Sequence, residues 1–267
     1  MTQPAAAPAG GAAQPGADAP DVALLVTCLV DAFRPSVGFA AVRLIEEAGC
    51  KVHVPESQTC CGQPAWNSGD RDGAAALAAR TIEAFEGYDY VVLPSGSCAA
   101  TMIKDYPEMF RAEDPMRARA EALAAKTHEL VSFLADIRGM TGVEAALSGS
   151  ATYHDSCSGL RSLKIKDQPR ALLASVEGLE LREMQESDVC CGFGGTFCVK
   201  YPEVSGVMAG DKTRNAAETG ADLVLAGDLG CLMNIAGKAS REGLSIKARH
   251  VAEVLAGMTD TPAIGEE

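Results

Sequence analysis

The sequence lacks the features that mark membrane, secreted and nucleic-acid-binding proteins. None of its apolar runs reaches about 18 residues, so no transmembrane helix is predicted. Basic residues are scarce, and the net charge of −13 argues against nucleic acid or an anionic membrane surface as the main partner. Residues 1–20 lack the basic start and apolar centre of a signal peptide. We expect them to form a disordered tail on a cytoplasmic protein.

Two short motifs are also missing. No two cysteines have the Cys-x-x-Cys spacing, which argues against a zinc knuckle. The glycines of CGFGGTF (191–197) lack the G-x-G-x-x-G spacing, so no nucleotide site is predicted there. We expect these glycines to let the backbone approach a bound group closely, with N–H groups directed at sulfur.

Cysteine, by contrast, is abundant and regularly placed. Eight of the ten cysteines form two sets with the order Cys, Cys-Cys-Gly, Cys, and matched members lie 129 to 133 positions apart. The two sets are Cys28, Cys60, Cys61 and Cys98, then Cys157, Cys190, Cys191 and Cys231. A repeat of this length indicates a domain duplication. In a reducing cytoplasm such cysteines predict metal ligands or catalytic groups rather than disulfides.

Short apolar runs alternate with helical patterns in both halves. The predicted strands cover 22–27, 51–55, 90–94, 150–154, 179–183 and 222–227. Predicted helices lie between them, and a helical stretch closes each half, one containing 128–135 and the other covering 250–256.

This alternation predicts two duplicated α/β domains with mostly parallel sheets, at 21–139 and 150–258, followed by a tail at 259–267. All the recurrent cysteines then fall at or just beyond the C-terminal ends of strands, and we expect one pocket per half.

Four thiolates per half are compatible with three kinds of chemistry. Iron–sulfur clusters are held by about four thiolates each, and one cluster per half is the preferred interpretation. A structural zinc also takes four thiolates, but each half is large enough to form its own core, and no recurrent cysteine is replaced by histidine. A redox-active thiol pair is the third possibility, although a disulfide between adjacent cysteines is strained.

Two cysteines and three histidines lie outside the repeated pattern. We expect Cys50 and Cys198 to pack as small hydrophobic residues, with an alternate ligand role open for Cys198. His154 is expected to be structural, with proton transfer as the alternative. His128 and His250 recur at nearly matched places and are expected to terminate or orient a repeated helix.

Five stretches of the sequence resemble a known family. The chain is similar to proteins with the cysteine-rich CCG domain, such as the CCG-domain component of heterodisulfide reductase and the iron–sulfur component of glycolate oxidase. Within this group it most resembles the lactate utilisation protein A family, and the likeness covers roughly residues 22–257. The stretches are LLVTCLVDAF (24–33), CCGQPAWNSG (60–69), PSGSCAAT (94–101), CCGFGGTF (190–197) and GCLMNIAG (230–237).

The resemblance implies an iron–sulfur electron-transfer component of L-lactate oxidation to pyruvate, acting with lactate utilisation proteins B and C. It implies two [4Fe-4S] clusters held by the eight recurrent cysteines. Heterodisulfide reductase relatives end each set with a fifth cysteine, where this chain has Thr101 and Asn234. The site would therefore have four thiolates, or include a non-cysteine ligand. The alternatives are a heterodisulfide- or thiol-reducing component and a zinc-stabilised scaffold; no residue is assigned a catalytic role.

Overall fold

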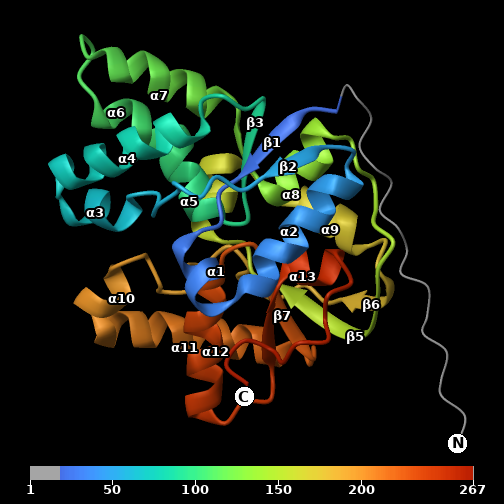
Figure 1. Ribbon diagram of the computed structural model, residues 1–267. Coiled ribbons are helices and arrows are strands. Elements are labelled where there is room, and N and C mark those ends of the chain that lie inside the picture. The colour runs from blue at the N-terminus through green and yellow to red at the C-terminus, as the bar shows by residue number, and fades with distance from the viewer. Residues whose placement is uncertain (1–18, 267) are drawn as a thin grey trace, which may run out of the picture.

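Two four-stranded parallel sheets organise the chain (Figure 1). The computed structural model describes residues 19–266, so most of the predicted N-terminal tail lies outside the described residues. The first sheet has the order β2 (Lys51–His53), β1 (Asp21–Leu24), β3 (Tyr90–Leu93), β4 (Thr127–Glu129). The second has the order β6 (Glu177–Leu181), β5 (Ala146–Tyr153), β7 (Leu223–Ala226), β8 (Lys247–His250). The predicted pair of α/β units with parallel sheets is confirmed.

Helices follow most strands in both halves. The first half contains α1 (Cys28–Phe33), α2 (Pro35–Glu47), α3 (Gln63–Ser68), α4 (Arg71–Phe85), α5 (Gly96–Ala100), α6 (Tyr106–Met109), α7 (Pro115–Ala125) and α8 (Leu130–Ser132), with π-helical turns η1 (Thr101–Asp105) and η2 (Phe133–Ile137). The second half contains α9 (Asp167–Leu173), α10 (Phe197–Lys200), α11 (Pro202–Glu218), α12 (Leu229–Glu242) and α13 (Val251–Leu255), with the π-helical turn η3 (Ser158–Ser162).

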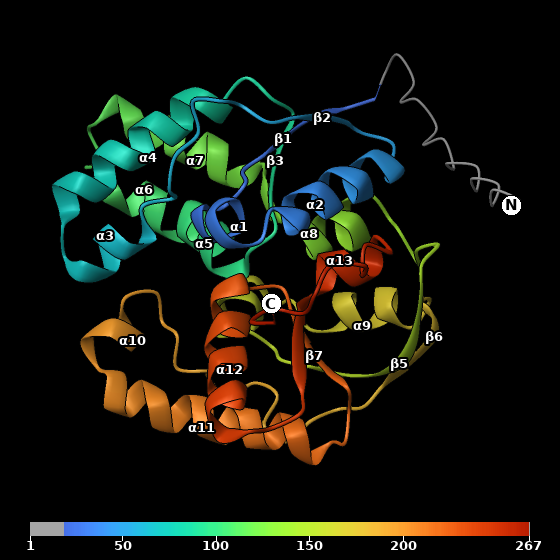
Figure 2. The ribbon, with the colours of Figure 1, turned by 60° about the horizontal axis from the view of Figure 1, so that its bottom comes forward.

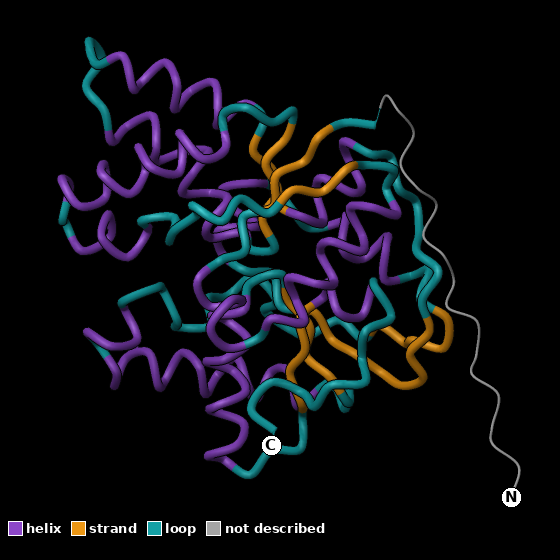
Figure 3. Tube along the Cα trace, viewed as in Figure 1, coloured by secondary structure: helices purple, strands orange, loops and turns teal. Residues whose placement is uncertain are grey.

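The two sheets share one central core. Buried residues of α2, α8, η2, α9 and α13 form a single apolar cluster with side chains from both sheets. Figure 2 shows these helices between the two sheets, and Figure 3 shows the strands as two separate groups. Two further clusters lie on the outer faces, one with α4 and α7 and one with α12. The halves are therefore held together by buried apolar surface, the main favourable term in folding.

The central strands have both faces buried, as parallel sheets covered by helices do. In β1, Val22 and Leu24 point into the central core, while Ala23 points into the outer core of the first half. This alternation follows from the two-residue period of a strand. It explains why the strand reads as a continuous apolar run.

Side-chain caps fix the starts of the helices that follow. Asp70 accepts a hydrogen bond from the Gly73 N–H at the start of α4, and Ser95 accepts one from the Cys98 N–H in α5. Such caps satisfy N–H groups that have no partner inside the helix. The Ser95 cap thereby fixes the first turn of α5, which contains Cys98.

The stretches that close each half begin with a strand, which the helical prediction missed. Residues 127–129 form β4 and residues 247–250 form β8, each pairing with the neighbouring central strand. His250 caps α13 by accepting a hydrogen bond from the Ala252 N–H, as expected of a residue that orients the helix. In the first half Glu129 caps α8 in this way, and His128 packs beside Phe133 instead.

The end of the chain packs on both halves. Ile264 forms a bridge with Ala248 of β8, in the segment that was predicted to be a tail. Glu253 of α13 is fully buried and accepts hydrogen bonds from Arg34 and Ser36 of the first half, at 2.8 and 2.6 Å.

No helix within residues 19–266 is long and apolar enough to cross a membrane.

Candidate metal centre

The recurrent cysteines lie where the strand order places a site. In the first sheet β1 and β3 are neighbours at the centre, although β2 comes between them in the sequence and lies at the edge. The second sheet has the same arrangement, with β5 and β7 at the centre and β6 at the edge. Open parallel sheets bind ligands at the carboxyl ends of strands flanking such a switch. Cys28 and Cys98 follow β1 and β3, and Cys157 and Cys231 follow β5 and β7. The Cys-Cys-Gly segments follow the neighbouring strands β2 and β6.

The carboxyl ends of the two sheets open into one shared cavity. Its volume is about 370 Å³, and all eight recurrent cysteines line it. The expectation of one pocket per half is therefore wrong, although each set of four still comes from one half. The reason is the central core, which places the cysteine-bearing edge of one sheet opposite that of the other.

A serine–aspartate network joins the halves beside the cavity. The Asp228 carboxylate accepts hydrogen bonds from the hydroxyls of Ser95 and Ser97, at 2.8 and 2.7 Å, and from the Ser97 N–H. Close by, a Cβ on Gly96 would lie only 3.1 Å from the backbone of Gly159. A side chain at this crossing would require the neighbouring backbone to move by a few tenths of an ångström, so glycine lets the two halves approach closely here.

The two Cys-Cys-Gly segments have the same backbone conformation. Gly62 and Gly192 both have a φ of 82°, in the left-handed region that glycine adopts without strain. The Gly192 N–H donates to the Cys190 Sγ at 3.4 Å, and the Gly62 N–H makes the corresponding bond to Cys60. Within 191–197, the Gly192 N–H is thus directed at a cysteine sulfur, and Gly62 shows the same arrangement in the first half, where it was not predicted.

Different side chains form hydrogen bonds with the backbone of the two Cys-Cys-Gly segments. The Tyr106 hydroxyl donates to the Cys61 carbonyl at 3.0 Å, and the Asn234 amide donates to the Cys191 carbonyl at 2.8 Å. The resemblance to heterodisulfide reductase implied that a fifth cysteine would be found at the position of Asn234. In this chain its side chain positions a cysteine backbone.

The close thiols perturb one another's ionisation. Hydrogen bonds from the thiols of Cys28 and Cys61, and from the Gly62 N–H, lower the pKa of Cys60 to about 2. The same contacts, with burial, raise the pKa of Cys28 and of Cys61. Cys28 is exposed, whereas Cys61 is buried. Metal binds the thiolate form, which these hydrogen bonds favour at Cys60.

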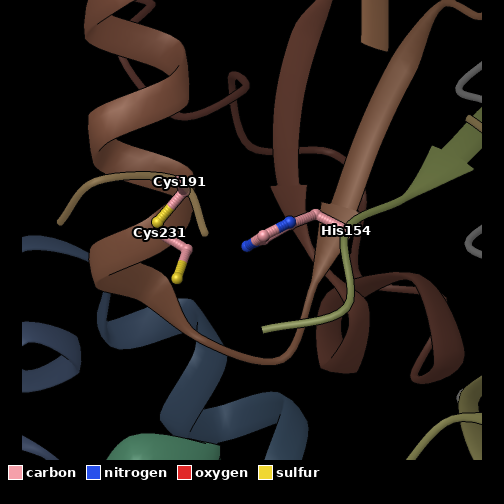
Figure 4. A group of neighbouring side chains, drawn as sticks. All are labelled: His154, Cys191 and Cys231. Atoms are coloured by element: carbon pink, nitrogen blue, oxygen red, sulfur yellow. The ribbon is translucent and has the colours of Figure 1, made fainter. Parts of the chain in front are cut away.

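In the second half a histidine joins the thiols (Figure 4). Side-chain ligand atoms of His154, Cys191 and Cys231 lie within 4.8 Å of one another, and all three residues are buried. They come from the end of β5, the loop before α10 and helix α12. Burial and the nearby Lys212 lower the pKa of His154 to about 3, which keeps the ring neutral and able to bind metal.

The two remaining cysteines do not line the cavity. Cys50 is fully buried in the central core, as its expected packing role requires. The Cys198 thiol donates a hydrogen bond to the Gly195 carbonyl, 3.7 Å away.

Several cavity residues were not predicted as site residues. Gln63 and Asn67 lie on one helical face of α3, and Asp228 precedes α12; all three line the cavity. Gln63 directly follows the first Cys-Cys-Gly segment and Asn67 comes one helical turn later, so their proximity in the sequence was the available signal. Nothing in the sequence showed that Asp228 would reach the serines of the other half.

The donor atoms fit a thiophilic metal group. Eight cysteines line a single cavity of about 370 Å³, near the lower end of the usual range for small-molecule sites, and the buried His154 imidazole lies beside two of them. Thiolate and imidazole donors suit iron–sulfur clusters and zinc, whereas magnesium and calcium prefer oxygen. The residues present therefore fit the iron–sulfur chemistry expected from the sequence.

Comparison with known proteins identifies the family. The CCG cysteine-rich domain matches the chain twice, over residues 22–103 and 151–236. "Lactate utilization protein A" from Geobacillus kaustophilus is 49% identical over 234 residues, covering 88% of this chain and 98% of that protein. The protein of the same description from Bacillus cytotoxicus is 46% identical with the same coverage. The chain belongs to the lactate utilization protein A family.

A solved structure supports the fold alone. A hypothetical protein from Helicobacter pylori aligns with a TM-score of 0.62 at 11% identity, covering 93% of this chain. This chain spans about half, 51%, of that protein's length. The match over nearly all of this chain supports the arrangement of two sheets around a shared centre, and says nothing of its chemistry.

Proposed function

We propose that the cavity holds two [4Fe-4S] clusters and that the protein carries electrons in the oxidation of L-lactate to pyruvate. The observation that supports this most strongly is the convergence of all eight recurrent cysteines on one cavity. Clusters of this type take about four thiolates each, which matches the two sets. The lactate assignment comes from the relatives, which are described as lactate utilization proteins.

Two clusters in one cavity suit the electron count of this reaction. Oxidation of L-lactate to pyruvate releases two electrons and two protons, and iron–sulfur clusters usually pass single electrons. One cluster per cysteine set would hold the pair of electrons within one protein. The protein's part is to set the potential and access of each cluster through thiolates, N–H groups and burial.

The chain requires partners for the bond-breaking step. Removing hydrogen from the carbon that bears the hydroxyl group requires a group that accepts a hydride or an electron pair, and the sequence shows no nucleotide fingerprint or flavin motif. We propose that two partner proteins, lactate utilisation proteins B and C, supply what this chain lacks. The chain acts in the cytoplasm in this proposal.

The cluster proposal is tested by metal analysis. Protein purified or reconstituted without oxygen is expected to hold about eight iron atoms per chain and to show a visible absorption band that bleaches with dithionite. Replacing Cys60 or Cys190 with Ser should lower the iron content, because each removes one thiolate from one set. Iron well under about four atoms per chain in the unaltered protein would contradict the proposal.

The lactate proposal needs a separate assay. L-lactate-dependent reduction of an artificial electron acceptor should require this protein and both partners, with each omitted in turn. Activity should fall when Cys61 or Cys191 is changed to Ser. Full activity of the partners alone would remove this protein from the reaction. Robust turnover by this chain alone would reveal a catalytic site that the proposal does not include.

One observation favours a second candidate, a zinc-stabilised scaffold. His154, Cys191 and Cys231 are close enough to bind one zinc ion with modest movement. Zinc would give no visible band and no response to dithionite. The same metal analysis therefore separates the two candidates.

A further inference from the structure

His154 has an environment that is unusual for a buried histidine. Its side chain is fully buried, and neither ring nitrogen makes a hydrogen bond of good geometry among the described residues, although the Ser187 backbone lies near enough to act on the ring's pKa. A buried polar group without a partner costs about 1–3 kcal/mol. Such a cost is expected to be offset by a bound group that the ring contacts.

The ring points toward two recurrent cysteines (Figure 4). Its ligand nitrogen and the sulfur atoms of Cys191 and Cys231 are separated by no more than 4.8 Å. Two donor atoms bound to one tetrahedral metal at about 2.0–2.3 Å lie about 3.3–3.8 Å apart. A movement of about half an ångström at each atom would therefore bring all three to bonding distance of one metal group.

The first half has no equivalent histidine. Leu25 precedes Cys28 by three positions, as His154 precedes Cys157. Leu25 is fully buried in the outer apolar core of that half. The two cysteine sets therefore match, but the residue three positions before the first cysteine of each set is apolar in one half and an imidazole in the other.

We propose that His154 is a metal ligand in the second half, supplying an imidazole donor beside Cys191 and Cys231. The first site then has thiolates alone, and the second has thiolates and one imidazole. This rests on the proposed cluster function for the identity of the metal. A neutral nitrogen donor adds no negative charge, and histidine ligation raises the potential of iron–sulfur centres. The second site is thus the more easily reduced of the two.

The test replaces the ring and observes the metal directly. His154→Leu copies the residue found at the matching position of the first half, and His154→Gln retains a polar side chain. His53→Gln is the control, because His53 is partly exposed and pairs with Asp21 at the edge of the first sheet. Each protein is prepared with isotopically labelled histidine, and iron is measured in parallel.

Electron paramagnetic resonance of the reduced wild-type protein should show hyperfine coupling to the nitrogen of a metal-bound histidine. This coupling should persist in His53→Gln and disappear in both His154 variants, and the higher of the two reduction potentials should fall. A wild-type protein with full iron but no bound nitrogen would overturn the inference and leave the cluster proposal intact. A signal that survives in His154→Leu would do the same.

If the protein binds zinc alone, the cluster proposal fails while the histidine inference is still tested. X-ray absorption at the zinc edge would then show an imidazole shell that is lost in His154→Leu, or its absence would refute the ligand role. A wild-type protein that binds no metal refutes both.

Discussion

The paired glycines of the two Cys-Cys-Gly segments allow a controlled test of how tightly each cysteine pair is held. Gly62 and Gly192 share the same φ of 82°, so alanine at either position carries the same left-handed backbone penalty of about 1–2 kcal/mol. Their surroundings differ. An added Cβ at position 62 would have its nearest neighbours at 3.5 Å, the Ala74 carbonyl oxygen and the Leu77 side chain, which is an ordinary contact.

At position 192 the same atom would lie 2.7 Å from the Ser205 carbonyl oxygen and 3.0 Å from the Met208 side chain. The first of these is a backbone atom in α11, so the loop or the helix must shift. Overpacking of this kind adds about 1–3 kcal/mol. We therefore expect Gly192→Ala to lower the free energy of unfolding by about 2–5 kcal/mol and Gly62→Ala by about 1–2 kcal/mol.

The assay is urea unfolding of the reduced, metal-free protein. The two variants are compared with wild type using one common slope for the dependence of unfolding free energy on urea concentration. Metal loading gives a second measurement: Gly192→Ala should lose metal from the second set, because the shift moves Cys190 and Cys191. Gly62→Ala should keep most of its metal. Equal destabilisation of the two variants, or a larger effect at Gly62, would refute the packing argument.

Three further predictions concern individual residues. Cys50→Ala and Cys198→Ala should retain most of their iron, because neither side chain lines the cavity; loss of iron in Cys198→Ala would make that residue a ligand. Cys190→Ser should lose about half of the iron, and complete loss would show that the two sites form only together. Burial raises the pKa of Glu129 to about 7, so wild type should lose about 3 kcal/mol of stability relative to Glu129→Gln as the pH rises from about 4.5 to 7. Glu129→Gln should remove that slope in urea unfolding midpoints, and an unchanged slope would refute the assignment.

The sequence was sufficient to predict the duplicated α/β plan. The apolar runs at 22–27 and 222–227 contain most of β1 and all of β7, and the cysteines fall at strand ends as expected. Strands β4 and β8 were missed because each is only a few residues long and runs directly into a helix. A three-residue strand such as 127–129 contains too little of the two-residue period to stand out from a helical pattern.

The shared cavity could not be predicted from spacing. Whether two similar halves turn their cysteines toward or away from each other depends on which helices pack between the sheets. That choice is made by contacts such as Glu253 with Arg34, which lie 219 positions apart. His154 was seen as a candidate from its place near Cys157, but only the structure shows its unpartnered ring nitrogens.

The central core also bears on how this chain arose. A single half would expose the apolar surfaces of α2, α8 and η2 that now contact α9 and α13, and its four cysteines would lie at an open edge. An ancestor containing one half would therefore have needed to pair with a second copy, because a symmetric dimer buries the same surface on both protomers. Fusion of the two genes would have freed each half to diverge, and the contrast between Leu25 and His154 is the expected trace of that freedom.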